Sequence, residues 1–410
     1  MSDLSLSKAP VATLHATATL GAWVAALKSV SAGIGSRAPL PILSGVRITT
    51  SVGGYVEVAT FDYENAAVAT VAGGIGGVGS NGLAVVGYKQ LLDILVGAGK
   101  RATKRISDGW NVSMALDGNK LAVDVNGAAF TLFAFDASEY PQLPNLTSQD
   151  VVTVDAGLFI RRMDSAMVAV STDDTLPILT SIRIEVENGT MTLLSTDRYR
   201  LVMAELPVGA TVGSYSALLK AKTWKAWKKA LNAKGGTLHM MFHDAEPKNE
   251  GSYGRIGATH ARLSVLQAGV ELGALTVDGD YPKIKSLFPD STPIVFEMDA
   301  DQLAACVASV AVVAARNTPV KFTYNGIDSL RVSAGDGEDA QAEAFLPYSS
   351  SIGNRGFAVA FNPSYLVDTL KDFKGQRIQF QHTAAPKPAT VVGVDSSSVQ
   401  HLIMPVRLPS

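Results

Sequence analysis

The feature that most constrains this chain is an internal repeat. The letters LPIL occur at residues 40–43, within RAPLPILSGVRITT, and again at residues 176–179, within DDTLPILTSIRIEV. A helix-like segment precedes each copy, and an alternating strand follows it at residues 46–48 and 182–184. Because one order of elements that recurs along a chain indicates one recurring fold unit, this repeat restricts the architecture before any other property is considered.

The match continues beyond the first strand of each copy. VEVATFDYENAAVATV matches MTLLSTDRYRLVMAEL, which sets Asp62 opposite Asp197. After a glycine-rich break, a second helical segment reads YKQLLDILVGAGK in one copy and LLKAKTWKAWKKALNAK in the other. Both copies end in strands closed by a proline turn, SEYPQLP and GDYPKIKSLFP. Because Asp62 and Asp197 are equivalent positions, they favour a turn role over paired catalytic carboxylates.

A third, fainter copy follows the same order. Its helices are DADQLAACVASVAVVAA and NPSYLVDTLKDFKG, with Asp299 and Asn362 as expected N-caps and Gly375 as the expected stop. We therefore expect an α+β protein of three similar domains, at residues 1–148, 149–291 and 292–410. Each domain should hold about two helices and several strands.

Composition fits a folded protein that carries no membrane segment. Hydrophobic residues make up 47% and charged residues 18% of the 410. No apolar run reaches the roughly 18 residues of a membrane span, and the N-terminus lacks the pattern of a secretory signal. The single cysteine, Cys306, excludes an internal disulfide framework, reads as an inert core thiol and fits a reducing cytoplasm. We expect a cytoplasmic location.

Charge is informative only in its distribution, since the net charge is −2. Residues 214–234 hold six lysines and no acid, and the pattern predicts an amphipathic helix. At about 100° per residue its apolar side lies roughly 200° from its cationic side. The cationic side carries Lys222, Lys225 and Lys229, and the apolar side carries Trp224, Trp227 and Leu231. A row of one sign costs a few tenths of a kcal/mol per like pair, which favours an anionic partner over a merely solvated face.

Other helical segments carry the same sign. These cations are Lys28, Arg37, Lys89, Lys100, Arg101, Arg161, Arg162, Lys371 and Lys374, the last two diluted by Asp368 and Asp372. Acids concentrate instead in expected strands and turns such as DGEDAQAEAF, HDAEPKNE and IEVEN. Cationic helices and anionic strands in a nearly neutral protein predict two surfaces with different partners.

The chain resembles the bacterial replicative sliding clamp, the beta subunit of DNA polymerase III, over essentially its whole length. The resemblance is carried, in order, by RAPLPILSGV, LSTDRYRL, VDGDYPKIKSLFP, FNPSYLVDTL and the terminal LIMPVRL. The spellings FDYE and TDRYRL are similar to those of the actinobacterial branch. Several dispersed motifs in the right order make the resemblance specific.

This resemblance implies a head-to-tail homodimer that closes into a ring, with helices lining the hole and antiparallel sheets on the rim. It also implies a non-catalytic processivity factor without a cofactor, associated with the nucleoid during replication. The ring would encircle double-stranded DNA without reading its sequence. Its other partners would be the DNA polymerase III alpha subunit, the clamp loader and further proteins with clamp-binding peptides. No Walker lysine motif is present, so ring loading would use another protein's ATP hydrolysis.

Three sets of site residues follow. The resemblance implies DNA contacts at Arg37, Lys89 and Lys222, to which the helical geometry adds Lys220, Lys225 and Lys229. It implies a peptide pocket formed by Leu179, Thr196, Arg198, Tyr199, Arg200, Leu201, Pro282, Leu287, Met404, Pro405, Val406 and Arg407. It places ring closure at Phe130 and Leu132, on an edge strand, against Val312 and Val313 of the partner subunit.

The pocket residues suit an apolar peptide anchor, because methionine adapts its shape and aliphatic walls exclude water. Ser286 departs from the basic residue often found in the family, so we expect a changed preference at the pocket's edge. Leu179 and Leu201 would serve equally well as core residues, and that reading stays open.

Two further patterns resemble ligand-binding motifs but lack part of the signature that such motifs require. GIGGVG at residues 74–79 matches a dinucleotide fingerprint, but the following SNGLAVV reads as a strand instead of a helix. His239, His243 and His260 suggest a metal, yet no cysteine or carboxylate pair completes a ligand set, so we expect none.

Three alternatives remain open from the sequence. The chain could be a repeat-built adaptor that binds only peptides, with solvated lysines. It could be an enzyme that uses the histidine-bearing insertion. It could also be a specialised clamp paralogue that confers antibiotic resistance or serves a mobile element.

Overall fold

The computed structural model describes residues 14–35, 40–77, 81–148, 151–209, 213–244, 261–288, 294–313, 318–324, 329–335, 340–348, 357–383 and 387–406. Its contacts divide the chain into two compact units. Unit 1 comprises residues 1–157 and 222–276, and unit 2 comprises residues 158–221 and 277–410.

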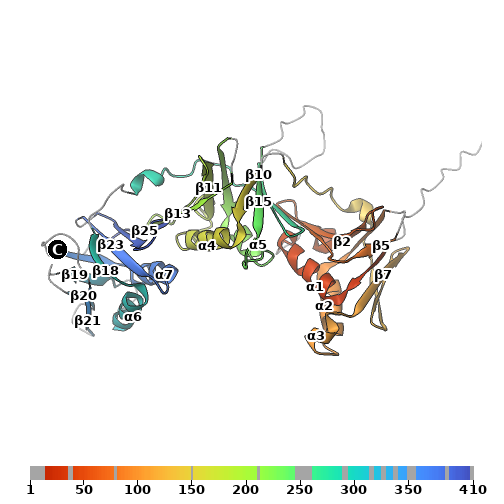
Figure 1. The fold of residues 1–410 in the computed structure, drawn as a ribbon, viewed down its shortest axis with the longest axis horizontal. Coiled ribbons are helices and arrows are strands. Elements are labelled where there is room, and N and C mark those ends of the chain that lie inside the picture. The colour runs from red at the N-terminus through yellow and green to blue at the C-terminus, as the bar shows by residue number, and fades with distance from the viewer. Residues whose placement is uncertain are drawn as a thin grey trace, which may run out of the picture. The chain divides into compact units, whose positions relative to one another are not determined.

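One order of elements occurs three times along the chain, as the repeat predicts (Figure 1). The first repeat contains β1 (His15–Thr19), α1 (Leu20–Ser29), η1 (Val30–Gly33), η2 (Pro41–Ser44), β2 (Gly45–Thr50), β3 (Val56–Phe61), β4 (Asn65–Thr70), β5 (Ile75–Gly76), β6 (Gly82–Gly87), α2 (Tyr88–Gly99), α3 (Lys104–Ser107), β7 (Asn111–Asp117), β8 (Lys120–Val125), β9 (Ala128–Phe133) and η3 (Ala137–Glu139). The second contains β10 (Val151–Asp155), α4 (Ala156–Met167), β11 (Ser181–Glu187), β12 (Thr190–Thr196), β13 (Arg200–Pro207), β14 (Tyr215–Lys220), α5 (Ala221–Trp227), β15 (Thr237–His243), β16 (Arg262–Gln267), β17 (Val270–Leu275) and η4 (Lys285–Leu287). The third contains β18 (Ile294–Asp299), α6 (Ala300–Val310), η5 (Ala311–Val313), β19 (Val320–Tyr324), β20 (Ser329–Ala334), β21 (Ala342–Pro347), β22 (Phe357–Phe361), α7 (Pro363–Asp372), β23 (Arg377–Gln381), β24 (Ala389–Gly393) and β25 (Val399–Ile403).

The two LPIL segments form the same turn. The amide of Leu43 donates to the carbonyl of Leu40 at 3.1 Å, and the amide of Leu179 donates to that of Leu176 at 2.9 Å. In both copies the next hydroxyl, Ser44 or Thr180, donates to the carbonyl of the turn's proline. Proline fixes φ near −65° and so starts the turn that feeds the following strand.

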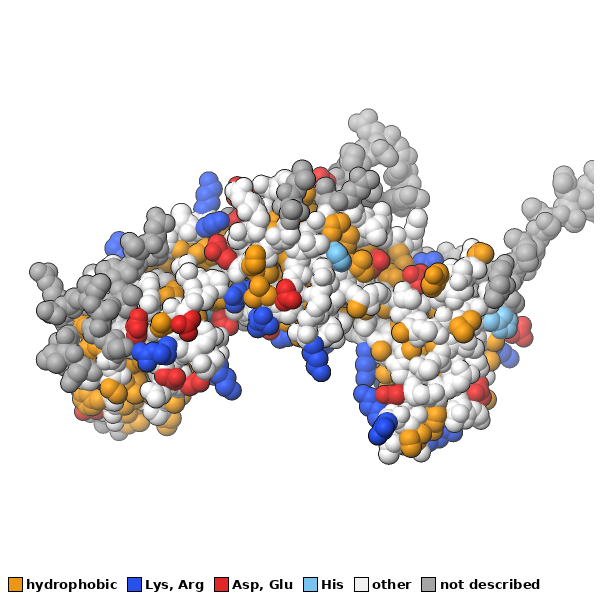
Figure 2. Space-filling model, in the orientation of Figure 1, with side chains coloured by type: hydrophobic (Ala, Val, Ile, Leu, Met, Phe, Trp, Pro, Cys, Tyr) orange, Lys and Arg blue, Asp and Glu red, His pale blue; other side chains and the backbone are white. Residues whose placement is uncertain are grey.

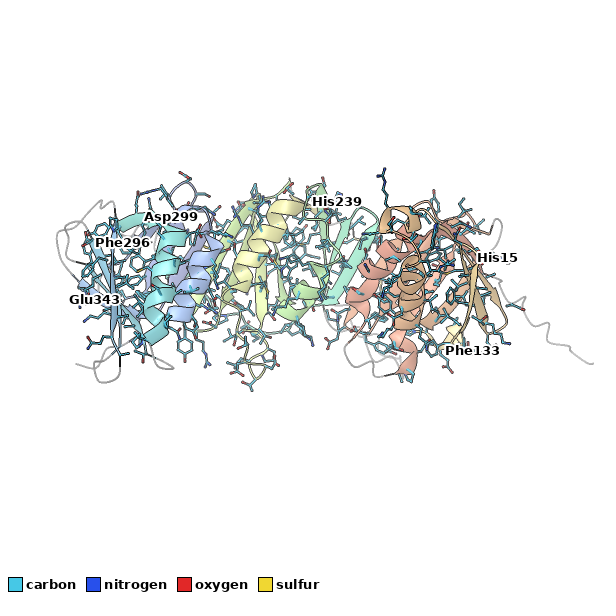
Figure 3. All side chains as sticks on the ribbon, turned by 90° about the horizontal axis from the view of Figure 1, so that it is seen from below. His15, Phe133, His239, Phe296, Asp299 and Glu343 are labelled. Carbon is cyan, nitrogen blue, oxygen red and sulfur yellow. The ribbon has the colours of Figure 1, made fainter. Side chains whose placement is uncertain are left out.

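Unit 1 contains a five-stranded sheet, in the order β5-β1-β7-β8-β9, and an eight-stranded sheet, in the order β10-β15-β16-β17-β4-β3-β2-β6. The eight-stranded sheet joins two repeats, because β4 of the first pairs with β17 of the second. Helices α1 and α2 pack side by side over the strands (Figure 3). Trp23 and Leu27 of α1 are fully buried, which anchors this helix to the core.

Unit 2 repeats this arrangement. Its eight-stranded sheet runs β14-β11-β12-β13-β25-β24-β23-β18, and β13 of the second repeat pairs with β25 of the third. A four-stranded sheet, β21-β20-β19-β22, completes the unit. Helices α6 and α7 pack against each other, and Phe296 and Phe380 stack in parallel at 4.7 Å in the core.

The predicted helix ends of the third repeat are confirmed. The Asp299 carboxylate accepts the amide of Gln302 at 2.9 Å, and the Asn362 side chain accepts the amide of Ser364 at the same distance. Gly375 has a φ of +74°, the conformation that ends helices and favours glycine. Cys306, on α6, is 7% exposed, as expected of a core thiol.

The predicted helix over residues 214–234 is wrong in its extent. Residues 215–220 form β14, which pairs with β11 from Tyr215 to Lys220, and α5 covers only residues 221–227. Pairing with β11 buries Leu218 and Leu219, so sheet formation overrides the helical pattern there. Lys220 therefore ends a strand, and Lys229 lies in the turn after the helix.

Candidate functional site

The β12–β13 turn holds the first candidate site. One oxygen of the Asp197 carboxylate accepts the amides of Tyr199 at 3.0 Å and Arg200 at 2.9 Å. The Thr196 hydroxyl accepts the amide of Arg198 and donates to the carbonyl of Arg200, both at 3.0 Å. These bonds hold Arg198 at a φ of +80°, a left-handed conformation that costs a non-glycine residue about 1 kcal/mol or more.

The equivalent turn of the first repeat has the same build. Asp62 accepts the amides of Glu64 and Asn65, and Tyr63 has a φ of +74°. Burial raises the pKa of the Asp62 carboxyl, although its hydrogen bonds act in the opposite direction. The prediction that Asp62 and Asp197 shape turns is confirmed.

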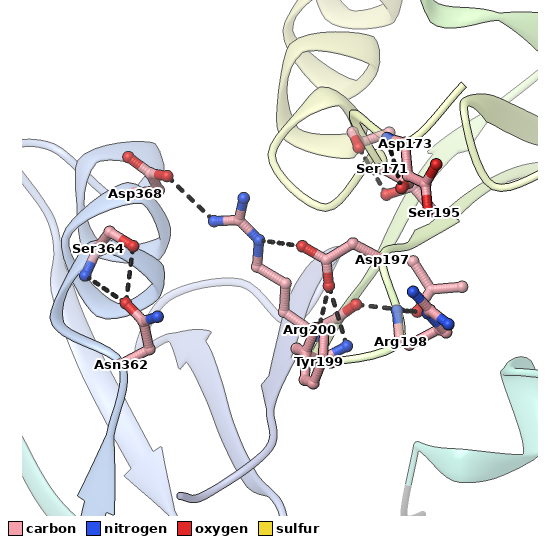
Figure 4. Close-up of polar contacts among 12 residues, drawn as sticks. Ser171, Asp173, Ser195, Asp197, Arg198, Tyr199, Arg200, Asn362, Ser364 and Asp368 are labelled. Atoms are coloured by element: carbon pink, nitrogen blue, oxygen red, sulfur yellow. Dashed lines mark hydrogen bonds and ion pairs between the residues drawn. The ribbon is translucent and has the colours of Figure 1, made fainter. Parts of the chain in front are cut away.

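Arg200 is fixed from several sides (Figure 4). Its Nε donates to Asp197 at 2.9 Å, and its Nη1 donates to Asp368 of α7 at 3.1 Å. The guanidinium lies 4.6 Å from the centre of the Tyr365 ring, which also stacks on Tyr199 at 6.2 Å. Burial, with Asp197 nearby, raises the pKa of Tyr365. Helix α7 thus positions the turn.

A buried apolar cluster supports the turn from below. Its members come from stretches far apart in the sequence, namely Leu194, Leu201, Met203, Leu218, Tyr281, Ile284, Phe288 and Leu402, with Ile178 and Val277 packed against it. Leu201 is the strand partner of Leu402, and the amide of Met404 donates to the carbonyl of Tyr199 at 2.8 Å. Burial raises the pKa of Tyr281 far above its usual range.

Large apolar side chains are exposed above this cluster. Exposed fractions are 55% for Tyr199, 57% for Leu287, and 38% each for Met404 and Val406. An apolar rim over an apolar floor can take an apolar side chain from a ligand, since its contact removes both surfaces from water.

The three sequence stretches predicted to form the pocket lie together in the structure, but some of their residues are buried and others are exposed. Leu179, Thr196 and Leu201 are buried and form the floor and its support. Arg198, Tyr199, Pro282, Leu287, Met404, Pro405 and Val406 are exposed or half-buried. Ser286 is exposed on η4 and donates to the carbonyl of Lys283 at 3.0 Å. Arg407 lies outside the described residues.

Sequence reasoning missed Tyr365 and Asp368 as members of this site. Both lie in FNPSYLVDTL, a motif that carried the family resemblance without a role of its own. The available signal was their helical spacing: residues three apart share one side of a helix, here the side that meets Arg200.

The second candidate site is cationic. On α5 the side chains of Lys222 and Lys225 are exposed, whereas Trp224 and Trp227 are 1% and 0% exposed. The predicted two-sidedness is therefore confirmed on the shorter helix. Among the described residues, no carboxylate lies within ion-pair distance of Lys222, Lys225 or Lys229.

The helices of unit 1 add more cations. Lys89 is exposed on α2 and pairs with Asp93, whose side chain is 62% exposed, so the pair contributes about 0–1 kcal/mol at most. Lys and Arg side chains gather along the helix-bearing edge of this unit (Figure 2). Arg37 lies outside the described residues.

A cationic turn around α3 was only partly anticipated. Lys100, Lys104 and Arg105 are exposed, in the segment GKRATKRIS that contains no acid. Arg101 fixes this turn, because its Nη2 donates to the carbonyl of Val125 at 2.8 Å and its guanidinium lies over Trp110. Lys104 and Arg105 could have been found by the same single-sign pattern that marked residues 214–234.

The remaining helical cations differ in role. Arg161 is exposed, but Arg162 points inward and donates to the carbonyl of Glu205 and the hydroxyl of Ser398. Burial lowers the pKa of Arg162. On α7, Asp372 binds His401 at 2.7 Å and Ser165 at 3.0 Å, so this acid serves the interior instead of the helix surface.

Of the predicted ring-closing residues, Phe130 and Leu132 lie on an edge strand, and Val312 and Val313 lie on the short helix η5. Strand β9 is the edge of the five-stranded sheet, and Phe130 lines an open hollow of about 470 Å³ between α2 and β9. Leu132 is only 5% exposed and packs inside its own unit, whereas Phe133 on the opposite face of β9 is 69% exposed (Figure 3). Val312, on η5, is 82% exposed, and Val313 beside it is half-buried.

The weaker patterns gain no support in the described part of the chain. Residues 82–87 form strand β6, as the strand reading of SNGLAVV predicted, and Val78, Gly79 and Ser80 lie outside the described residues. His243 binds the Ser264 hydroxyl at 2.7 Å, and His260 lies outside the described residues. Within the described ranges, no group of three or more His, Cys, Asp or Glu side chains could hold a metal, and no helix is long and apolar enough to cross a membrane.

Comparisons with known proteins agree with this architecture. Three family models of the DNA polymerase III beta subunit match this chain. The model of the N-terminal domain matches residues 20–144, that of the central domain residues 153–283 and that of the C-terminal domain residues 285–407. The beta sliding clamp of Micrococcus luteus is 34% identical over 314 residues, 76% of this chain and 91% of that protein. That of Streptomyces coelicolor is 31% identical over 383 residues, 91% of this chain and 94% of that protein.

The fold is also that of a solved clamp. The crystal structure of the DNA polymerase sliding clamp from Bacillus subtilis superimposes with a TM-score of 0.83 at 20% identity, covering 97% of this chain and 100% of that one. With all three domain profiles matched in order, the chain belongs to the family of DNA polymerase III beta subunits, the beta sliding clamps.

Proposed function

We propose that this chain is a DNA sliding clamp that encircles duplex DNA and tethers the replicative polymerase to it. The observation that carries the proposal is the exposed lysine row of α5, backed by two buried tryptophans, within a fold of three clamp domains. We assign these domains to residues 1–148, 149–291 and 292–410.

Lysine is suited to this contact because its ammonium meets phosphates without reading base edges. Lys222, Lys225 and Lys229 form the proposed contact, with Arg37, Lys89 and Lys220 beside them. We add Lys100, Lys104 and Arg105 of the α3 turn. Contacts of this kind are independent of sequence and weaken as salt rises, because each one releases condensed counterions.

Retention then comes from enclosure and not from tight binding. We propose a head-to-tail homodimer, with the β9 edge of one subunit meeting the η5 region and neighbouring strands of the other. An edge strand that pairs across subunits satisfies its open backbone groups and is withdrawn from aggregation. Phe130 and Phe133 are the apolar residues of β9 available for this contact, while Leu132 supports the strand from inside.

The β12–β13 site is the proposed docking place for linear peptides of partner proteins. Its partners would be the DNA polymerase III alpha subunit, the clamp loader and other replication or repair proteins. The exposed rim of Tyr199, Leu287, Met404 and Val406 takes apolar anchors, and Arg198 provides charge at the edge. The clamp itself performs no chemistry in this role; it raises processivity by keeping its partners on the template.

Retention on closed and open DNA tests the proposal. The protein, loaded on nicked circular duplex, should remain bound through gel filtration and should be lost after the circle is linearised, because a ring slides off free ends. Replacing Lys222, Lys225 and Lys229 by Glu should reduce retention while peptide binding to the β12–β13 site stays intact. Unchanged retention in this variant would support a peptide adaptor with solvated lysines instead.

A further inference from the structure

The first repeat contains a second apolar cluster of the same build as the β12–β13 site. Its members are Ile42, Leu43, Phe61, Ala66, Val85, Tyr140 and Leu146, with Val68, Ala137 and Leu143 packed against it. All of them lie in unit 1. Several correspond by position in the repeat: Ile42 to Ile178, Val85 to Leu218 and Tyr140 to Tyr281.

Backbone contacts show that the two clusters lie at equivalent positions of the repeat. In unit 1 the amide of Leu275 donates to the carbonyl of Glu64 at 2.8 Å, and in unit 2 the amide of Met404 donates to that of Tyr199 at 2.8 Å. Both bonds link the left-handed turn to the strand that arrives from the next repeat. Ala66 pairs with Gly273 on β17, just as Leu201 pairs with Leu402 on β25.

The two sites differ in what fills them. Leu146 and Leu287 lie at the same distance after their tyrosines, yet Leu146 is 4% exposed and Leu287 is 57% exposed. In the second repeat the linker enters the cluster one residue later, with Phe288 at 8% exposure, and leaves Leu287 at the rim. The strands beneath Leu146 carry two small residues, Ala66 and Gly273. The equivalent positions of the second site are Leu201 and Leu402. A Cβ placed on Gly273 would lie 2.3 Å from Cδ2 of Leu146, so the leucine occupies the space that a side chain would need.

The segment that carries Leu146 is also fastened by a polar contact. The Ser264 hydroxyl donates to the carbonyl of Leu146 at 2.7 Å and is bound in turn by Nε2 of His243 at 2.7 Å. Ser264 is fully buried on β16. The linker between the first two domains is therefore seated against the sheet by both its side chain and its backbone.

We propose that the first repeat holds a second peptide-type site, which the chain fills with its own Leu146. The inference rests on the proposed peptide-binding function of the β12–β13 site, because it assigns the same ligand class, an apolar peptide anchor, to the equivalent position. The two linkers differ in which residue they bury: the second repeat buries Phe288 and leaves Leu287 at an open rim, whereas the first repeat places Leu146 itself in the cluster, over Gly273.

Peptide stoichiometry tests this assignment. An acetylated pentapeptide with two Leu and one Phe is titrated into the full-length protein by calorimetry. The unmodified chain should bind one peptide. Leu146→Ala, which removes the side chain that fills the site of the first repeat, should bind two. Met404→Asp should abolish peptide binding at the β12–β13 site. The double variant Leu146→Ala/Met404→Asp should again bind one peptide, now at the site of the first repeat.

The outcomes separate the two proposals. If the unmodified chain binds no peptide, the proposed function of the β12–β13 site fails. In a second outcome the unmodified chain binds one peptide as expected, while Leu146→Ala, shown to be folded by circular dichroism, still binds only one. That result overturns the assignment of Leu146 as the residue that fills a second site.

A second variant keeps the test decisive if Leu146→Ala does not fold. Gly273→Ala should expel Leu146, and hydrogen exchange of the amides at residues 143–148 should rise by about tenfold or more. Gly97→Ala is the matched control, because a Cβ at Gly97 meets no atom within 4 Å. Exchange that stays equal in the two variants would contradict the seating of Leu146 on Gly273.

Discussion

Arg200 and Asp368, which are 168 positions apart in the sequence, form an ion pair of 3.1 Å between the β12–β13 turn and helix α7. The Arg200 side chain is 13% exposed and also binds Asp197, so its guanidinium is held in place. A peptide that docks beside this turn meets a surface that is already ordered, which lowers the entropy lost on binding.

Asp368→Asn should weaken peptide binding at the β12–β13 site without affecting DNA retention. The Asp368 side chain is 47% exposed, so its ion pair contributes only about 0–1 kcal/mol, and we expect affinity to fall by about fivefold or less. Calorimetry with the pentapeptide measures the change. Glu187→Gln, an exposed acid of β11, is the control and should leave affinity unchanged; an equal loss in both variants would contradict a positioning role for Asp368.

Arg198→Gly and Arg198→Ala should separate backbone strain from side-chain contact. Both variants remove the guanidinium, but only glycine adopts a φ of +80° without steric cost. We expect Arg198→Gly to unfold at higher urea than Arg198→Ala, with a difference of about 1 kcal/mol in the free energy of unfolding. Peptide affinity should change equally in the two. Equal stabilities would show that the turn is not strained at this residue.

Replacing Lys100, Lys104 and Arg105 by Ser should reduce the salt dependence of DNA binding. Each lost phosphate contact lowers the slope of log K against log salt by about 0.9, so loss of all three would lower it by about 2–3. The measurement is a salt titration with labelled duplex. Lys120→Ser, at an exposed lysine of β8, should leave the slope unchanged, and a triple variant with the slope of the unmodified chain would identify the α3 turn as ordinary solvated surface.

The protein should lose stability as the pH falls below about 6.5, the pKa of a free histidine side chain. Burial lowers the pKa of His382, and burial together with Arg262 lowers that of His243. A lowered pKa in the folded state means that the unfolded chain takes up the proton first, so stability is complete above about pH 6.5 and decreases below it.

Urea midpoints at about pH 7.5 and about pH 5.5 check this sign. His382→Gln should show a smaller decrease between the two than the unmodified chain. His15→Gln, at an exposed position, serves as control. A midpoint that rises on acidification, with a smaller rise in His382→Gln, would reverse the assigned direction.

Phe130→Ser and Leu132→Ser should have different consequences for ring closure. Phe130 is half-buried at the open β9 edge, so its replacement should yield monomers that remain folded, detected as a halved mass in sedimentation. Leu132 is buried in its own unit, and its replacement should destabilise that unit by about 2–5 kcal/mol. Dimers of unchanged affinity in Phe130→Ser would remove this residue from the interface.

Much of the local structure could be read from short patterns. The LPIL turns, the caps at Asp299 and Asn362 and the buried face of Trp224 and Trp227 depend on residues within one or two turns of the chain, and such signals are present in the letters themselves. The helix at residues 214–234 was overestimated for the opposite reason. Its first half pairs with β11, and this pairing partner lies far away in sequence.

The sequence by itself determined the threefold order of elements, the sign of charge on the helices and the family. Only the tertiary structure decided which members of each motif face solvent and which form the core. It placed Asp368 on Arg200, turned Leu132 inward, and seated Leu146 over Gly273 while leaving Leu287 exposed. The physical reason is that periodicity reports which side of an element is apolar. Whether a given side chain finds space there depends on the size of residues that pairing brings from another repeat.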